Sequence, residues 1–209
     1  MSVFGKKQAL YVTAIALWAC LVGFGMNVMW RYSVTPGRAA IPKIDWPANA
    51  PVPLGKTRPT LVMFAHPNCP CSRASIGELA ILMARSQDKV DAHVFFYLPA
   101  NEPGAWARTD LWNSTASIPG VHVIEDREGA DARLFGAFTS GQTFLYNPGG
   151  RLLFNGGITA SRGHSGDNIG RDGIVALLHG GTFAQNVTPA FGCSLKGDEM
   201  NVLSSDDRR

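Results

Sequence analysis

The sequence predicts an α/β domain with a mixed central sheet, preceded by a single membrane-spanning helix. Three observations support this prediction. Residues 9–30 contain no charged side chain, prolines recur over residues 31–58, and stretches of strand and helix character alternate from residue 60 onward. With 209 residues, the chain has room for one ordinary globular domain and an accessory segment.

Residues 9–30 are long enough to cross a bilayer, because a helix of this length spans about 33 Å and the hydrocarbon core is about 30 Å thick. A cleaved signal peptide and a buried core helix are the alternatives. A short N-terminal tail normally stays inside. We therefore expect residues 1–8 in the cytoplasm and an extracytoplasmic soluble domain, which is periplasmic if the chain is bacterial.

The rest of the chain divides by composition. Residues 31–58 are expected to form a semi-extended tether, because their prolines exclude helix and central strand. The domain then covers residues 59–182, and residues 183–209 form a C-terminal tail.

The domain alternates strands and helices. Strands are expected at 60–65, 90–98, 121–124, 143–146 and 151–154, and helices from about residue 72 and at 104–115, 129–138 and 169–179. The last two strands are separated by Asn147-Pro-Gly-Gly150, which predicts a hairpin. This order predicts a mixed sheet with helices on both faces.

Cys69-Pro70-Cys71 lies where the first strand of the domain gives way to its first helix. A cysteine at a helix N-terminus has a lowered pKa, because unpaired N–H groups and the helix dipole favour the thiolate. Two cysteines at this place indicate a redox pair or a chelate for a soft metal. A Cys69–Cys71 disulfide can close, but in a small ring whose strain predicts an oxidising or isomerising couple.

An apolar strand, a cysteine pair at the next helix, and a late hairpin followed by a terminal helix resemble the thioredoxin superfamily. The similarity covers roughly residues 59–182, and its most specific part is residues 66–75, His-Pro-Asn-Cys-Pro-Cys-Ser-Arg-Ala-Ser. It is greatest to the membrane-anchored, extracytoplasmic TlpA and peroxiredoxin-like branch. The resemblance implies a thioredoxin-like three-layer fold, with Cys69 as the attacking thiol and Cys71 as the resolving one.

Two features depart from this family. The cysteine spacing is C-x-C instead of C-x-x-C, and Gln142 stands where thioredoxins place a cis-proline. In the family that proline contacts the partner peptide and keeps metals off the thiolates. Its replacement weakens a general reductase interpretation and leaves metal binding open.

Other residues are candidates for supporting roles. By topology, the glycine-rich loop 155–170 should border Cys69, which makes Arg162 and His164 accessory candidates. His66 either tunes the thiolate or only shapes the turn. Cys193 either folds back as an alternative resolving thiol or is a small buried residue that fixes the tail.

Two functions follow. The first is a membrane-tethered thiol–disulfide oxidoreductase without a cofactor, whose partners are cysteine-containing extracytoplasmic proteins. The second is a copper-delivery protein that resembles the Sco type and binds copper with Cys69, Cys71 and His164. The net charge of +3 is too small to indicate nucleic-acid binding, and the glycine-rich loop lacks the phosphate-loop pattern.

Overall fold

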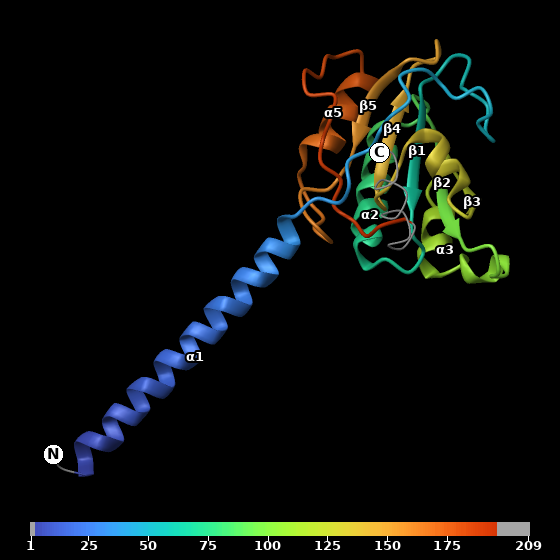
Figure 1. The fold of residues 1–209 in the computed structure, drawn as a ribbon. Coiled ribbons are helices and arrows are strands. Elements are labelled where there is room, and N and C mark those ends of the chain that lie inside the picture. Colours follow the sequence, from blue (N-terminus) through green and yellow to red (C-terminus); the bar gives the residue numbers. More distant parts are fainter. Residues whose placement is uncertain (1–2, 196–209) are drawn as a thin grey trace, which may run out of the picture. The chain divides into compact units, whose positions relative to one another are not determined.

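The computed structural model describes residues 3–195. The chain divides into two compact units, of which the first ends at Thr35 and the second begins at Pro36. The first unit is one uninterrupted helix, α1 (Val3–Val34; Figure 1). Its segment Lys7–Val34 has a mean hydropathy of 1.9 and is long and apolar enough to cross a membrane. The predicted span at 9–30 lies inside this segment, so the chain has one N-terminal apolar helix that can anchor it in a membrane.

The second unit is built on a five-stranded sheet of order β3-β2-β1-β4-β5. Its strands are β1 (Thr60–Ala65), β2 (Asp91–Leu98), β3 (Val121–Arg127), β4 (Gln142–Tyr146) and β5 (Leu152–Gly156). β1, β2 and β3 are parallel to one another, whereas β4 is antiparallel to both β1 and β5. The sheet is therefore mixed, as the sequence predicts.

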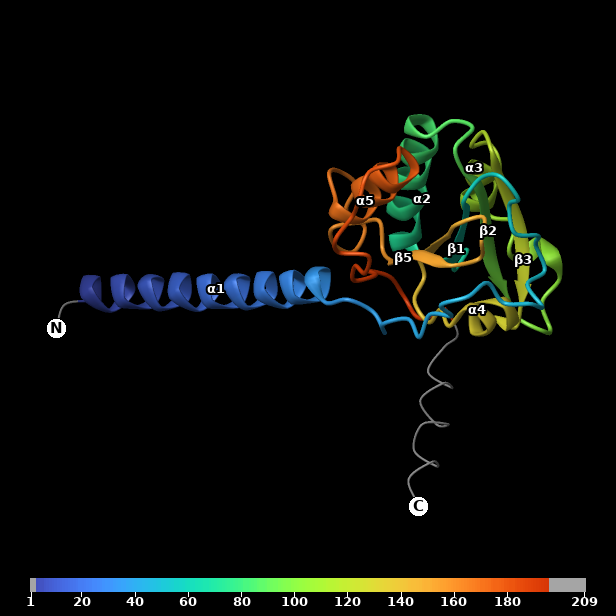
Figure 2. The same cartoon turned by 90° about the horizontal axis from the view of Figure 1, so that it is seen from above.

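Helices cover both faces of this sheet (Figures 1 and 2). They are α2 (Pro70–Arg85), the 3-10 turn η1 (Gly104–Trp106), α3 (Asp110–Ala116), α4 (Ala130–Phe135) and α5 (Ile169–Leu178). Side chains of α2, α3 and α5 share one hydrophobic core with the sheet, and α4 contributes to a second core on the opposite face. The result is a three-layer α/β unit.

Burial on both faces explains why β1 reads as a continuous apolar run rather than an alternating one. All of its residues are buried, and β1 occupies the centre of the sheet. The helix expected at 104–115 is instead split into η1 and α3. The break occurs because Thr109 is extended, with φ −76° and ψ 179°, and acts as the N-cap residue of α3.

The proline-rich segment, expected as a semi-extended tether, contacts the rest of the second unit. Residues 31–34 continue α1, and the chain from Pro36 onward packs against the domain. Ile41 N donates to Gly136 O at 2.9 Å, and the Trp46 ring lies edge-on to Phe135. Prolines do exclude a helix here, but an extended chain with apolar side chains still finds partners. This segment therefore helps to cover the second core.

The C-terminal tail also packs on the domain as far as residue 195; residues 196–209 of the expected tail lie outside the described part. Val187 forms a bridge with Asn155, and Ala190 O accepts a hydrogen bond from Gly37 N at 2.8 Å. Leu195 is buried in the second core. The compact unit from Pro36 onward thus includes packed chain on both sides of residues 59–182.

Candidate redox site

The first cysteine of the Cys-Pro-Cys motif occupies the N-cap position of α2. Cys69 has φ −90° and ψ 116°, and Pro70 starts the helix, where its missing N–H costs nothing. Cys69 N donates to His66 O at 3.1 Å, and Ser72 N donates to Cys69 O at 3.0 Å. These bonds fix the turn between β1 and α2, so the sulfur of Cys69 is held at the end of the central strand.

Three cysteine sulfurs meet at this point. The Sγ atoms of Cys69 and Cys193 lie 2.8 Å apart. The sulfur of Cys71 joins them, so that all three lie within 4.8 Å of one another. Cys69 is 3% exposed and Cys71 is 8% exposed, and all three are free thiols. The cluster brings together both members of the motif and the distant cysteine.

The backbone holds Cys193 in place through antiparallel pairing with the chain just before β4. Ser140 N donates to Cys193 O at 2.8 Å, Thr139 and Ser194 form a bridge, and Leu195 N donates to Phe138 O at 3.0 Å. Segment 192–195 therefore runs beside segment 138–140.

Gly192 is required for this close approach, because a Cβ atom there would lie 1.9 Å from Ser140 O. A larger residue at position 192 would force a shift at this contact and so disturb the pairing that positions Cys193.

Two buried serines connect the cysteine turn to the same segment. Ser72 Oγ and Ser140 Oγ lie 2.6 Å apart, and Ser140 Oγ also accepts a hydrogen bond from His66 N at 2.8 Å. The Ser72 hydroxyl also contacts His66 O at 3.3 Å. The turn, the start of α2 and the approach to β4 thus form one hydrogen-bonded unit around the sulfurs.

The three thiols differ in acidity. Burial acts to raise the pKa of Cys69, but hydrogen bonds from Cys193 and Ser72 outweigh it, and the net pKa lies below the ordinary value. Burial and the neighbouring Cys69 raise the pKa of Cys71. Burial, the hydrogen bond with Cys69 and its charge raise the pKa of Cys193 to about 12. Cys69 is therefore the one of the three thiols whose pKa is lowered, which favours its thiolate, and the hydrogen bond from Cys193 is the largest cause of that lowering.

Arg162 lies at the edge of this cluster. Its guanidinium donates to Gly192 O and lies near Cys71 and Cys193, where it acts to lower the pKa of both thiols. The predicted place of loop 155–170 explains this contact, because Gly156 at the end of β5 pairs with Thr143 in β4.

His164, in the same loop, is exposed and does not belong to the three-sulfur group. The alternative copper ligands considered from the sequence, Cys69, Cys71 and His164, thus differ from the group of possible metal ligands that lie together among the described residues, which is Cys69, Cys71 and Cys193. Cys193 takes the third place because the backbone pairing of segment 192–195 directs it to Cys69.

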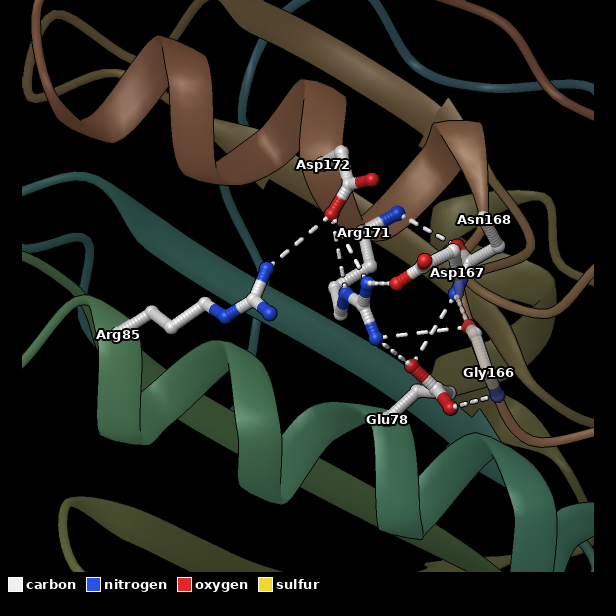
Figure 3. Close-up of polar contacts among 7 residues, drawn as sticks. All are labelled: Glu78, Arg85, Gly166, Asp167, Asn168, Arg171 and Asp172. Carbon is white, nitrogen blue, oxygen red and sulfur yellow. Dashed lines mark hydrogen bonds and ion pairs between the residues drawn. The ribbon is translucent and has the colours of Figure 1, made fainter.

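A buried ion pair anchors the glycine-rich loop to α2 (Figure 3). Glu78 of α2 and Arg171 of α5 are 0% and 2% exposed, and Arg171 Nη1 lies 2.5 Å from Glu78 Oε2. The other carboxylate oxygen accepts from Gly166 N at 2.7 Å, and Asn168 Nδ2 donates to Glu78 Oε2 at 3.1 Å. Asn168 also caps α5 through Arg171 N. These contacts fix the loop that carries Arg162.

The remaining predicted site residues, His66 and Gln142, make contacts that shape the backbone. His66 stacks on Tyr97, with 5.7 Å between ring centroids, and burial lowers the pKa of its imidazole. Its Nδ1 accepts a hydrogen bond from Asn68 N, which fits the turn-shaping role. Gln142 pairs with Phe64 across the sheet, and its side chain accepts from Phe138 N at 3.3 Å.

Comparisons with known proteins show the fold. No protein-family model matches the chain, and no curated protein matches it. An uncharacterised conserved protein from Geobacillus kaustophilus has a similar structure, with a TM-score of 0.57 and 18% sequence identity over 79% of this chain and 94% of that one. A hypothetical protein from Sinorhizobium meliloti 1021 has a TM-score of 0.54 and 21% identity, covering 78% and 95% of the two chains.

An exposed lipoprotein thioredoxin from Streptococcus pneumoniae strain TIGR4 is more distant, with a TM-score of 0.43 and 15% identity, covering 60% and 86% of the two chains. The sheet order, the helices on both faces and the cysteine turn at the end of the central strand define the class of fold. The fold is thioredoxin-like, as the sequence resemblance implies.

Proposed function

We propose that this protein is a membrane-tethered thiol–disulfide oxidoreductase that acts on cysteine-containing extracytoplasmic proteins. The observation that carries the proposal is the state of Cys69. It is the N-cap residue of α2, its pKa is lowered, and its sulfur touches a second thiol. A thiolate is the nucleophile in disulfide exchange, and a neighbouring thiol is what completes the exchange. Cys69 supplies the thiolate and its neighbour supplies the second thiol, so the proposed reaction needs no cofactor.

The membrane part of the proposal rests on α1. An apolar segment at Lys7–Val34 suits a single anchor, and the short tail before it favours an N-terminus in the cytoplasm. The compact unit from Pro36 onward is then extracytoplasmic. Disulfides form and persist in such compartments, so clients with oxidisable cysteines are available there.

The rate at which iodoacetamide alkylates Cys69 should depend on pH with a midpoint below that of an ordinary cysteine, about 8.5. A lowered pKa keeps the reactive thiolate populated as the pH falls, and reactivity is lost only below the folded pKa. Fragmentation mass spectrometry, which distinguishes Cys69 from Cys71 within the peptide they share, measures this rate.

Ser72→Ala removes one hydrogen bond that lowers the pKa and should move the midpoint upward. The same protein unfolded in urea is the control. A folded midpoint equal to the unfolded one would contradict the assignment of Cys69 as the thiolate.

Delivery of Cu(I) is a second candidate, favoured by the three-sulfur cluster. Thiolates are soft ligands that select Cu(I), and the buried sulfurs of Cys69, Cys71 and Cys193 fit that preference. Copper would be the cargo of such a protein. If copper is bound, Cys193→Ser should weaken its uptake about tenfold or more, whereas His164→Ala should leave it unchanged.

Titration of the reduced full chain with Cu(I) against a competing chelator tests this candidate. Uptake that depends on His164 would overturn the three-cysteine ligand set. No uptake at all would exclude copper delivery and leave the oxidoreductase proposal standing.

A further inference from the structure

We propose that Cys193, and not Cys71, is the thiol that resolves a mixed disulfide on Cys69, so that the oxidised protein contains a Cys69–Cys193 disulfide. This inference rests on the proposed function and deepens it, because it assigns the second redox thiol to a segment far from the Cys-Pro-Cys motif in sequence. Cys71 becomes a third thiol beside the pair.

Distance and ring size both favour Cys193 over Cys71. The sulfurs of Cys69 and Cys193 already lie in contact at 2.8 Å. The sulfur of Cys71 also lies within 4.8 Å of that of Cys69, but Cys71 is the second residue of α2, and a disulfide between residues i and i+2 closes a small, strained ring. A Cys69–Cys71 bond would therefore distort the first turn of α2, including the hydrogen bond from Ser72 N to Cys69 O.

Contacts on both sides of Cys193 hold its segment in place beside Cys69. Its pairing with residues 138–140, the guanidinium of Arg162 on Gly192 O and the buried Leu195 hold it on both sides of the cysteine. Cys69 itself is 3% exposed, so its sulfur has to become accessible before it meets a client disulfide. Because the segment holds Cys193 against Cys69, Cys193 is next to the mixed disulfide once that has formed.

The pKa of Cys193 depends on whether Cys69 is a thiolate or part of a mixed disulfide. While Cys69 is a thiolate, its charge and hydrogen bond keep Cys193 protonated. When Cys69 enters a mixed disulfide, that charge disappears. Two of the causes that raise the pKa of Cys193 disappear with it, and the nearby Arg162 favours the thiolate. Formation of the mixed disulfide therefore favours the Cys193 thiolate relative to the reduced site, while burial, the largest cause of its raised pKa, remains.

The exchange balances in atoms and electrons. The Cys69 thiolate attacks one sulfur of a client disulfide, which forms the mixed disulfide and releases the other client sulfur as a thiolate. Cys193 then attacks the Cys69 sulfur, the Cys69–client bond breaks, and the Cys193 proton goes to the departing client thiolate. The client disulfide is reduced to one thiolate and one thiol, and the Cys69–Cys193 pair is oxidised because it gives up the same two electrons.

A tryptic map of the full chain in detergent tests the pairing, because Cys69 and Cys71 share the peptide 57–73 and Cys193 lies on the peptide 172–196. After oxidation with glutathione disulfide and alkylation of the remaining thiols, we expect the two peptides to be cross-linked. The cross-link should persist in Cys71→Ser, which identifies Cys69 as the partner. An internal disulfide within peptide 57–73 would overturn the inference, and this result needs no variant.

The kinetics of the glutathione adduct give a second test. Cys193→Ser should release glutathione from Cys69 at least about tenfold more slowly than the wild type, whereas its matched control Cys71→Ser should release it at the normal rate. The reverse pattern would assign resolution to Cys71. If wild-type Cys69 forms neither an adduct nor a disulfide, the proposed function itself fails, and this inference fails with it.

Discussion

Replacement of Cys69 by serine is expected to lower the rate of reaction with glutathione disulfide by at least about a thousandfold. The reason is chemical: the lowered pKa of Cys69 supplies a thiolate, and a serine hydroxyl at the same N-cap position stays protonated. Consumption of glutathione disulfide by the reduced full chain in detergent measures the effect.

The matched control for this experiment is Cys71→Ser, which removes a thiol two residues away whose pKa is raised. It should react with glutathione disulfide at a rate near that of the wild type. Equal activity of Cys69→Ser and the wild type would contradict the assignment of the nucleophile.

Replacement of Glu78 by glutamine is expected to destabilise the folded domain by about 3–5 kcal/mol, because it leaves the buried guanidinium of Arg171 without its buried counter-charge. The other carboxylates near Arg171 are those of Asp167 and Asp172, which are 99% and 50% exposed and cannot replace Glu78 in the interior. Urea unfolding followed by near-UV circular dichroism measures the change in the free energy of unfolding.

Arg85→Ala is the control for the buried pair, because the ion pair between Arg85 and Asp172 is half-exposed on both sides and 3.4 Å long. Its loss should cost about 1 kcal/mol or less. An equal effect of the two substitutions would show that the pair in Figure 3 does not anchor the loop as described.

Much of the architecture could be predicted, because short stretches of the sequence indicate their own strands, helices and turns. The apolar run at β1 and the turn at Asn147–Gly150 mark their elements by composition alone. Strand direction predicts which edge of the sheet carries the cysteines, namely the one where β1 ends. Because β4 is antiparallel to both β1 and β5, β5 ends at the same edge, which places loop 155–170 near Cys69. Arg162 confirms that placement by its contact with Gly192 O.

The sequence left the position of Cys193 open between folding back to the motif and fixing the tail, because no local motif surrounds it and its contact with Cys69 spans 124 residues of sequence. That contact depends on the pairing of Ser194 with Thr139, which has no signature in the sequence. Glu78 and Arg171 were missed for a similar reason. A charged residue within an apolar helical stripe is a weak signal, and its partner lies on another helix.

The packing of the proline-rich segment could not be predicted from its composition. Its prolines correctly exclude a helix after α1, but composition cannot tell an extended spacer from an extended chain that packs. Trp46 was the available signal, since a large aromatic side chain is costly to leave in water. In the structure its ring contacts both Phe135 and Tyr146.

The most direct test of the central claim is an equilibrium titration of the full chain in detergent with glutathione redox buffers, with free thiols counted by alkylation and mass spectrometry. We expect two thiols of the wild type to disappear together as one two-electron couple, and no such couple in Cys69→Ser. A wild-type protein that keeps all its thiols reduced up to the poise of an oxidising compartment, about −180 mV, would contradict the assignment as a thiol–disulfide oxidoreductase.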